Sequence, residues 1–234
     1  MNTLAVMQPY FFPYIGYFQL IGAVKEFVFY DDVQYIKSGW INRNRILING
    51  SPNYITIPCN NASPNRMINE VEFALDPRTK KKLLNKIAIT YKKAPFFDSV
   101  NQLIIETLDT EGGLISNLAI KSIIKCSDYL DIDTTFVKSS EKFSNKELDA
   151  APRLIDMCKQ ENALEYINPI GGKDLYNKDY FSNNGVELRF LETRLDGYVQ
   201  FGHEFIPGLS IIDVLMFNSP QKIKEEFLAN PKLC

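Results

Sequence analysis

The chain has 234 residues, with 26 basic and 28 acidic side chains and a formal net charge of −2 at neutral pH. This length suits one medium-sized domain, and the near balance of charge excludes an overall field that would attract nucleic acid. No apolar run approaches the roughly 20 residues that span a bilayer, and no signal-peptide pattern opens the chain. We therefore expect a cytoplasmic protein without a membrane span, in which local groups hold any anionic ligand.

The first elements indicate a parallel sheet. An apolar run over residues 3–7 predicts a strand, helical spacing over 17–24 predicts a helix, and residues 25–30 form a second apolar run. This order begins a βαβ unit, and open parallel sheets bind ligands beyond the carboxyl ends of their strands. The loop that follows the first strand and the pair Asp31-Asp32 both lie at that edge.

A β-hairpin comes next. Two β-rich runs, 46–48 and 54–58, flank the dipeptide Asn49-Gly50, which favours a tight hairpin turn. Residues 71–75 add another strand.

The pattern then changes to helices. Asp76 can cap a helix that starts with Pro77, and apolar residues recur on one face as far as Tyr91. The remaining expected elements are helices at 99–109, 115–130, 146–160, 174–183, 210–217 and 221–228, and strands at 134–138, 165–167 and 186–190.

Together these elements predict an α/β fold. We expect a parallel or mixed Rossmann-like sheet with a β-hairpin and a helical middle and C-terminal layer. Residues 1–234 are expected to form a single domain, with the helical segment 76–130 as an insertion or a layer.

The loop after the first strand crowds six aromatic residues and two prolines into residues 8–18. One interpretation is a stiff crossover whose rings cover the edge of the sheet. The other is a pocket wall, in which Tyr10 and Tyr14 stack on a base or sugar and the amide of Gln8 recognises polar groups. The position after the first strand favours the pocket wall.

The pair Asp31-Asp32 follows the second strand. Either carboxylate could hold Mg²⁺, act as a general base or cap the next turn. Adjacent side chains on a strand point to opposite faces, so we expect only one of the two to reach a given pocket.

Residues 34–45 contain the densest set of polar side chains and the only tryptophan. Guanidinium and ammonium groups bind phosphate, and asparagines supply directed donors and acceptors for a sugar. The alternative is a solvated hairpin guarded by basic residues. The candidate substrate-binding residues of this segment are Gln34, Lys37, Trp40, Asn42, Arg43, Asn44 and Arg45.

Two smaller features complete the candidates. Gly171 and Gly172 follow a predicted strand, where glycine either lets backbone N–H groups approach a phosphate or simply makes a turn. His203 is the only histidine, so acid–base work near neutral pH would fall to it unless it is incidental. The four cysteines lack CxxC spacing, and with one histidine we expect no metal site.

Four motifs of the chain resemble the WbqC-like protein family. They are QPYFFPYIGYF at 8–18, FVFYDDVQYIKSGWINRNRI at 27–46, the stretch 166–172 and LSIIDVLMFN at 209–218. The family's motif positions in this chain are Gln8, Pro9, Tyr10, Pro13, Gly16, Asp32, Gln34, Lys37, Asn42, Arg43, Asn44, Arg45, Ser210 and Asp213. The resemblance implies a setting in bacterial O-antigen or surface-polysaccharide synthesis, with glycine transfer suggested for some members.

The resemblance and the candidate residues together predict a transferase. It would place an acyl or aminoacyl group, glycyl being the family's suggestion, on the amine of a nucleotide-linked amino sugar. Asp32, His203 or Asp31 would be the catalytic base. An ATP-dependent amide ligase and a non-catalytic carbohydrate-binding protein remain alternatives, and the residues identify neither a cofactor nor an oligomeric state.

Overall fold

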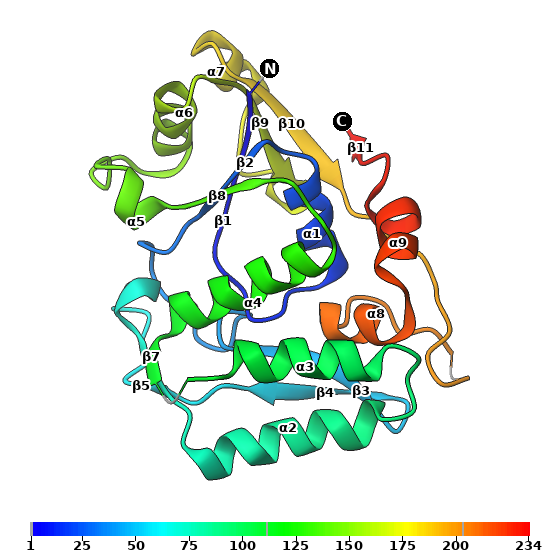
Figure 1. Cartoon of the computed structure of the whole chain (residues 1–234). Coiled ribbons are helices and arrows are strands. Elements are labelled where there is room, and N and C mark those ends of the chain that lie inside the picture. The colour runs from blue at the N-terminus through cyan, green and yellow to red at the C-terminus, as the bar shows by residue number, and fades with distance from the viewer. Residues whose placement is uncertain (1, 111, 203) are drawn as a thin grey trace.

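A computed structural model describes residues 2–110, 112–202 and 204–234 of the chain (Figure 1). The candidate base His203 lies outside the described residues. The expected α/β class is confirmed, because a mostly parallel sheet is combined with helices along the chain.

A six-stranded sheet forms the centre of the upper part in Figure 1, with the order β11-β10-β9-β1-β2-β8. All neighbouring pairs are parallel except β10 with β11. Its strands are β1 Asn2–Met7, β2 Glu26–Phe29, β8 Thr135–Lys138, β9 Ala163–Pro169, β10 Glu187–Glu192 and β11 Lys232–Leu233. The chain places β1, β2 and β8 successively in one direction and then returns to place β9 and β10 on the other side of β1.

Both faces of this sheet are buried. Along β1, Leu4 and Val6 belong to one apolar cluster, whereas Ala5 between them belongs to the other. Such alternation follows from the two-residue period of a strand, and burial on both faces is typical of parallel sheets. One cluster contains residues of α1 (Ile15–Gly22) and α4 (Ile115–Tyr129), and the other contains residues of α6 (Ala150–Gln160) and α7 (Lys178–Asn183).

The expected hairpin is formed by β3 (Arg43–Ile48) and β4 (Ser51–Thr56). Its turn residues Asn49 and Gly50 both have positive φ, 50° and 73°, as a two-residue type I′ turn requires. Strand β3 begins earlier than the apolar run suggested, so Arg43, Asn44 and Arg45 lie within it.

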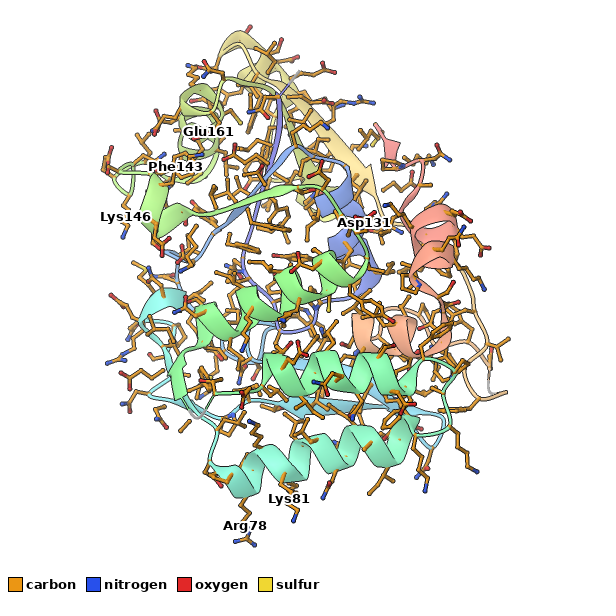
Figure 2. The ribbon with its side chains drawn as sticks, viewed as in Figure 1. Arg78, Lys81, Asp131, Phe143, Lys146 and Glu161 are labelled. Atoms are coloured by element: carbon orange, nitrogen blue, oxygen red, sulfur yellow. The ribbon has the colours of Figure 1, made fainter. Side chains whose placement is uncertain are left out.

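Helices α2 (Pro77–Tyr91) and α3 (Phe97–Thr107) lie below the sheet in Figure 1, next to the hairpin. The Asp76 side chain caps α2 by accepting from the backbone N–H groups of Arg78 and Thr79. Arg78 and Lys81 extend from α2 away from the rest of the molecule (Figure 2). A small antiparallel sheet of β5 (Cys59–Asn60), β6 (Glu72–Ala74) and β7 (Gly112–Leu114) was not fully anticipated.

Several boundaries differ from the sequence-based expectations. Helix α1 starts at Ile15 rather than at residue 17, and α6 starts at Ala150 rather than at residue 146. The remaining elements are the 3₁₀ turns η1 (Ile68–Glu70) and η2 (Ile170–Gly172), the helices α5 (Ser139–Lys142), α8 (Ile211–Phe217) and α9 (Pro220–Lys222), and the π-helical turn η3 (Ile223–Leu228).

Candidate functional site

A cavity opens where the strand order reverses, between the carboxyl ends of β1 and β9. Met7 ends β1 and Pro169 ends β9, and both line the cavity, whose volume is about 430 Å³. In doubly wound sheets this reversal point is where ligands bind, and the volume is within the usual range for small-molecule sites. The lining residues are Met7, Tyr10, Pro13, Tyr14, Trp40, Asn44, Arg45, Pro169 and Gly208.

The aromatic loop contributes both to the core and to the cavity. Phe11 and Phe12 are buried in the core, whereas Tyr10 and Tyr14 are partly exposed and line the cavity. The backbone N–H of Phe12 donates to the Ser122 hydroxyl of α4 at 3.0 Å. The two interpretations of the loop are therefore compatible, because its phenylalanines anchor it while its tyrosines face the opening.

Strand β3 fixes the same loop from the other side. The side-chain amide of Asn44 donates to the carbonyl oxygens of Phe11 at 3.1 Å and Phe12 at 2.8 Å. The Ser210 hydroxyl also donates to the Phe12 carbonyl, at 2.8 Å, and the Ser210 N–H donates to the Arg45 carbonyl at 2.8 Å. Asn44 is thus buried, and its amide is engaged by the loop. By holding Phe11 and Phe12, it fixes the positions of Tyr10 and Tyr14 in the cavity wall.

Gly16 allows the tyrosine wall to pack closely. A Cβ atom at this position would lie 2.5 Å from the Thr193 methyl group and 2.5 Å from the Tyr14 ring. The Tyr14 hydroxyl lies 3.4 Å from the Thr193 hydroxyl, at the edge of hydrogen-bonding distance. Burial raises the pKa of the Tyr10 hydroxyl, and the neighbouring Tyr14 adds to this effect, so Tyr10 remains a neutral donor at physiological pH.

Arg45 is the cation of the cavity. Its guanidinium lies 5.4 Å from the centre of the Trp40 ring, and one terminal nitrogen donates to the Gly208 carbonyl at 3.3 Å. Its Nε is buried, and no acceptor in the described part of the chain pairs with it. The buried Oε1 of Gln8, the residue that follows the cavity-lining Met7, likewise has no described partner. Buried polar atoms without partners are rare in folded proteins, and they call for an explanation such as an ordered water or ion.

The other polar residues of this segment lie outside the cavity. Arg43 donates to the carbonyl oxygens of Ser38 and Gly39, and its guanidinium stacks 4.4 Å from the centre of the Tyr54 ring. Asn42 links the Tyr35 hydroxyl to the Ile57 carbonyl.

Gln34 and Lys37 are exposed. Gln34 forms an isolated β-bridge with Met67. Neither residue lines the cavity. The structure therefore brings Tyr10, Tyr14, Trp40, Asn44 and Arg45 together, without Gln34, Lys37, Asn42 or Arg43.

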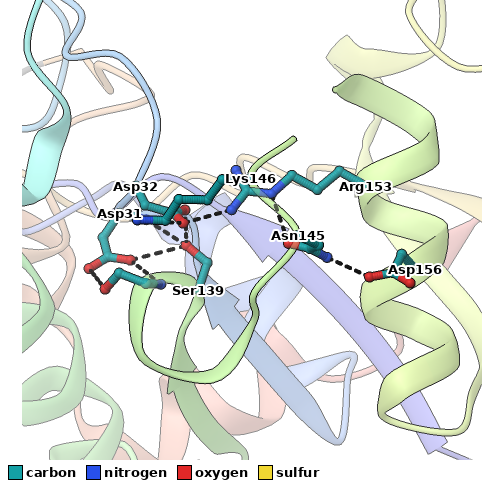
Figure 3. A network of polar contacts seen from close by, with 8 residues as sticks. Asp31, Asp32, Ser139, Asn145, Lys146, Arg153 and Asp156 are labelled. Atoms are coloured by element: carbon teal, nitrogen blue, oxygen red, sulfur yellow. Dashed lines mark hydrogen bonds and ion pairs between the residues drawn. The ribbon is translucent and has the colours of Figure 1, made fainter. Parts of the chain in front are cut away.

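The pair Asp31-Asp32 lies at the ends of β2 and β8 in a separate polar network (Figure 3). Asp32 is buried, and its carboxylate accepts from Arg153 Nη2 at 2.6 Å and from the Ser139 hydroxyl at 2.5 Å. The ammonium of Lys146 lies 3.7 Å from the same carboxylate. Arg153 is also buried, donates to Asn145 at 3.0 Å and lies over the Tyr30 ring.

Asp31 has a different set of partners. Its carboxylate accepts from the backbone N–H of Ser140 at 3.0 Å and from the Ser140 hydroxyl at 2.6 Å, and it lies 3.0 Å from the Ser139 hydroxyl, whose single proton is closer to Asp32. It therefore holds the first turn of α5, which lies 109 residues away in the chain, rather than capping the turn that follows it. Neither aspartate lines the cavity at the strand reversal.

The two glycines after β9 also differ from each other. Gly172 is buried, and a Cβ there would overlap the side-chain nitrogen of Asn168. Gly171 is exposed, and a Cβ there would meet no atom within 4 Å. Gly172 is thus required for packing against Asn168, and the part of this turn that reaches the cavity is the preceding Pro169.

Beside the cavity, Asp213 joins three segments. It accepts from the hydroxyls of Tyr91 and Tyr198, both at 2.6 Å, and from the Gln200 amide at 2.8 Å. Burial raises the pKa of this carboxyl, against the opposing effect of these three hydrogen bonds. Because Tyr198 and Gln200 belong to the segment that leads to Gly208, this buried group positions one wall of the cavity.

Sequence reasoning missed Arg153, Pro169 and Gly208. Arg153 lies four residues before Met157 on the buried face of α6, and a basic residue within an apolar stripe signals a buried counter-ion. Gly208 has a φ of 67°, which favours glycine, and the sequence around it has no periodic pattern that would place it.

The strand order defines an α/β protein with a Rossmann-like sheet and a cavity at the point of strand reversal. The profile of the WbqC-like protein family matches residues 8–225, and the chain belongs to this family. It is 29% identical over 228 residues to the uncharacterized protein Rv1507c of Mycobacterium tuberculosis, with 93% of this chain and 94% of that protein covered. No solved structure matches the chain. Among the described helices, none has the length and apolar character needed to cross a membrane.

Proposed function

We propose that the protein binds a nucleotide-linked amino sugar in the cavity and transfers an acyl or aminoacyl group, glycyl being one candidate, to the sugar amine. The observation that carries this proposal is the Arg45 side chain, which lines an aromatic cavity at the strand reversal and has an Nε without a partner among the described residues. A guanidinium that retains a free N–H can bind a phosphate or carboxylate, and tyrosine and tryptophan rings can stack on a base or sugar.

The chemistry needs mainly orientation. The amine nitrogen attacks the acyl carbonyl carbon, the bond from that carbon to the leaving group of a preactivated donor breaks, and the amine loses a proton. The described residues that line the cavity include no carboxylate and no imidazole. The base that accepts the amine proton must therefore come from outside the described lining residues. His203, five residues before Gly208 in the chain, is the candidate. Asp32, already paired with Arg153, is the less suitable candidate.

The first experiment tests binding. Nucleotide-linked amino sugars, the corresponding free nucleotides and the free sugars are compared by thermal shift and calorimetry, since a ligand of the folded state raises the melting temperature. The matched variants are Arg45→Met and Arg43→Met, which change the same residue type two positions apart on β3. We expect Arg45→Met to lower affinity about 10- to 100-fold, the typical contribution of a hydrogen bond from a charged donor, and Arg43→Met to leave it within about twofold.

Two outcomes would contradict the proposal of binding in this cavity. One is that no compound of the panel stabilises the protein, and the other is that both arginine variants lose affinity equally. The reaction is tested separately by following the mass of the amino sugar with a preactivated donor, or with the free acid, ATP and Mg²⁺. Product only in the second mixture would assign an amide ligase, and binding without product in either mixture would assign a carbohydrate-binding protein.

A further inference from the structure

Basic residues are concentrated on and just after helix α2. Residues 77–93 contain seven basic side chains and no acidic one, which leaves 19 basic against 28 acidic side chains elsewhere. In a chain of nearly balanced charge, this segregation produces a strong local positive field.

One face of α2 is buried against the protein, and the other is exposed to solvent. Leu83, Ile87 and Tyr91 are buried against the rest of the protein. Two of the basic residues are engaged, since Lys80 pairs with Asp109 at 3.2 Å and Lys86 donates to the Tyr54 carbonyl at 2.7 Å. The other five are exposed and form no ion pair with a described residue; they are Arg78, Lys81, Lys82, Lys92 and Lys93. Figure 2 shows Arg78 and Lys81 extending into solvent.

The same face carries apolar side chains that the fold does not cover. Ile89 lies between the two groups of basic residues and is 75% exposed. It lines a shallow hollow of about 510 Å³ together with Leu47, Ile48 and the 41% exposed Phe201, and Lys92 and Lys93 also line this hollow. In helices that lie in a membrane interface, apolar side chains enter the boundary with the acyl chains while flanking lysines bind anionic headgroups, and Ile89 with its flanking basic residues offers both kinds of contact.

We infer that the outer face of α2 and the adjoining hollow dock the protein onto an anionic membrane surface. The lysines and Arg78 lie against phosphate headgroups, while Ile89 and Phe201 enter the boundary with the acyl chains. A nucleic acid would also attract the basic residues, but it offers no apolar layer for an exposed isoleucine, and an acidic protein is distinguished from a membrane by the test below. This inference does not depend on the proposed function.

The test is co-sedimentation of the full chain with vesicles of phosphatidylcholine alone or with about one third phosphatidylglycerol. We expect binding to the anionic vesicles, weakened as salt is raised because screening shortens the range of surface charges. Each lysine removed near the surface is expected to reduce partitioning about fivefold, so Lys81→Gln with Lys82→Gln, or Lys92→Gln with Lys93→Gln, reduces it about 25-fold.

Matched control variants show whether vesicle binding depends on this surface rather than on the total number of lysines or exposed apolar residues. Lys159→Gln with Lys173→Gln removes two exposed lysines elsewhere, and we expect a change of less than about twofold. Ile89→Ser is compared with Leu175→Ser, since both residues are 75% exposed, and only the former is expected to weaken binding, by about fivefold. Unchanged melting temperatures show that all variants are folded.

Three outcomes would overturn the inference. They are equal binding to both kinds of vesicle, equal losses in the α2 variants and their controls, and binding to polyglutamate or polyuridylate without binding to vesicles. The last would assign the surface to an acidic protein or to RNA.

Discussion

Polar side chains near the carboxyl ends of β1 and β2, two neighbouring strands of one sheet, differ in whether their polar atoms have hydrogen-bond partners. Beyond β1, Arg45 and Gln8 retain buried polar atoms that no described residue satisfies, next to a cavity. Beyond β2, the carboxylates of Asp31 and Asp32 are held by serines and by Arg153. The carboxyl end of a parallel strand is therefore a good place to look for a site, but the hydrogen-bond partners decide which side chains are available to a ligand.

The test with the largest expected effect on stability removes Arg153, the cation that is paired with Asp32 beyond β2. Arg153→Met leaves the buried Asp32 with only the exposed Lys146, at 3.7 Å, as a counter-ion, and we expect a loss of about 3–5 kcal/mol in the free energy of unfolding, measured in urea. The control is Arg189→Met, which breaks a partly exposed pair with Glu165 and is expected to cost about 0–1 kcal/mol. Similar losses in both variants would mean that the network beyond β2 is not a special support of the fold.

The second test concerns the glycines after β9. Gly172→Ala forces a methyl group against Asn168, whose side chain is held by the Tyr166 hydroxyl, and we expect a cost of about 1–3 kcal/mol in unfolding free energy. Gly171→Ala meets no neighbouring atom within 4 Å and should stay within about 0.5 kcal/mol of the parent. Equal stabilities, with loss of ligand affinity in both, would instead place these glycines against a ligand.

The third test compares Tyr17, which is buried, with Tyr10, which lines the cavity. The Tyr17 hydroxyl is buried and donates to the Gln8 carbonyl at 2.9 Å, so Tyr17→Phe should cost about 1 kcal/mol in stability. Tyr10 lines the cavity, and its hydroxyl donates to no described residue. Tyr10→Phe should therefore change stability by less than about 0.5 kcal/mol while lowering ligand affinity roughly three- to tenfold. The opposite assignment of the two effects would contradict the position of the cavity.

The last test is a pH profile. Because burial raises the pKa of Asp213 above its value in the unfolded chain, the folded protein keeps a proton that the unfolded chain releases. The contribution of this group to stability is therefore greatest at acidic pH and falls as the pH rises from about 4 through the folded pKa. Comparison with Asp213→Asn in urea unfolding isolates the slope, since the other groups titrate in both proteins. A difference that is independent of pH would contradict the raised pKa, because it would mean that this carboxyl has the same pKa in the folded and unfolded chain.

Much of the fold followed from local patterns. The turn at Asn49-Gly50, the Asp76 cap and the apolar runs of β1 and β2 each have a local physical cause, and the structure contains the corresponding elements. The boundaries near residue 146 were less predictable, because the loop before α6 is fixed by contacts with Asp32 rather than by its own sequence. The π-helical turn Ile223–Leu228 has the apolar spacing of an ordinary helix.

The candidate site was predictable in type but not in membership. Arg43 and Arg45 are equivalent in sequence, and only the three-dimensional positions of Ser38, Tyr54 and Gly208 distinguish the occupied guanidinium from the available one. Pro169 and Gly208 come from parts of the chain that carry no chemical signature of their own. Their inclusion depends on strand order, which no local pattern specifies.

The hydrogen bonds of Ser210 to Phe12 and Arg45 join segments that are 198 and 165 positions apart in the chain. Contacts of such long sequence separation form late, because closing the intervening loop is entropically costly. During synthesis, the aromatic loop therefore leaves the ribosome long before the segment that completes its surroundings. The cavity would be completed only near the end of folding, and a ligand bound in it would report completion of the entire fold.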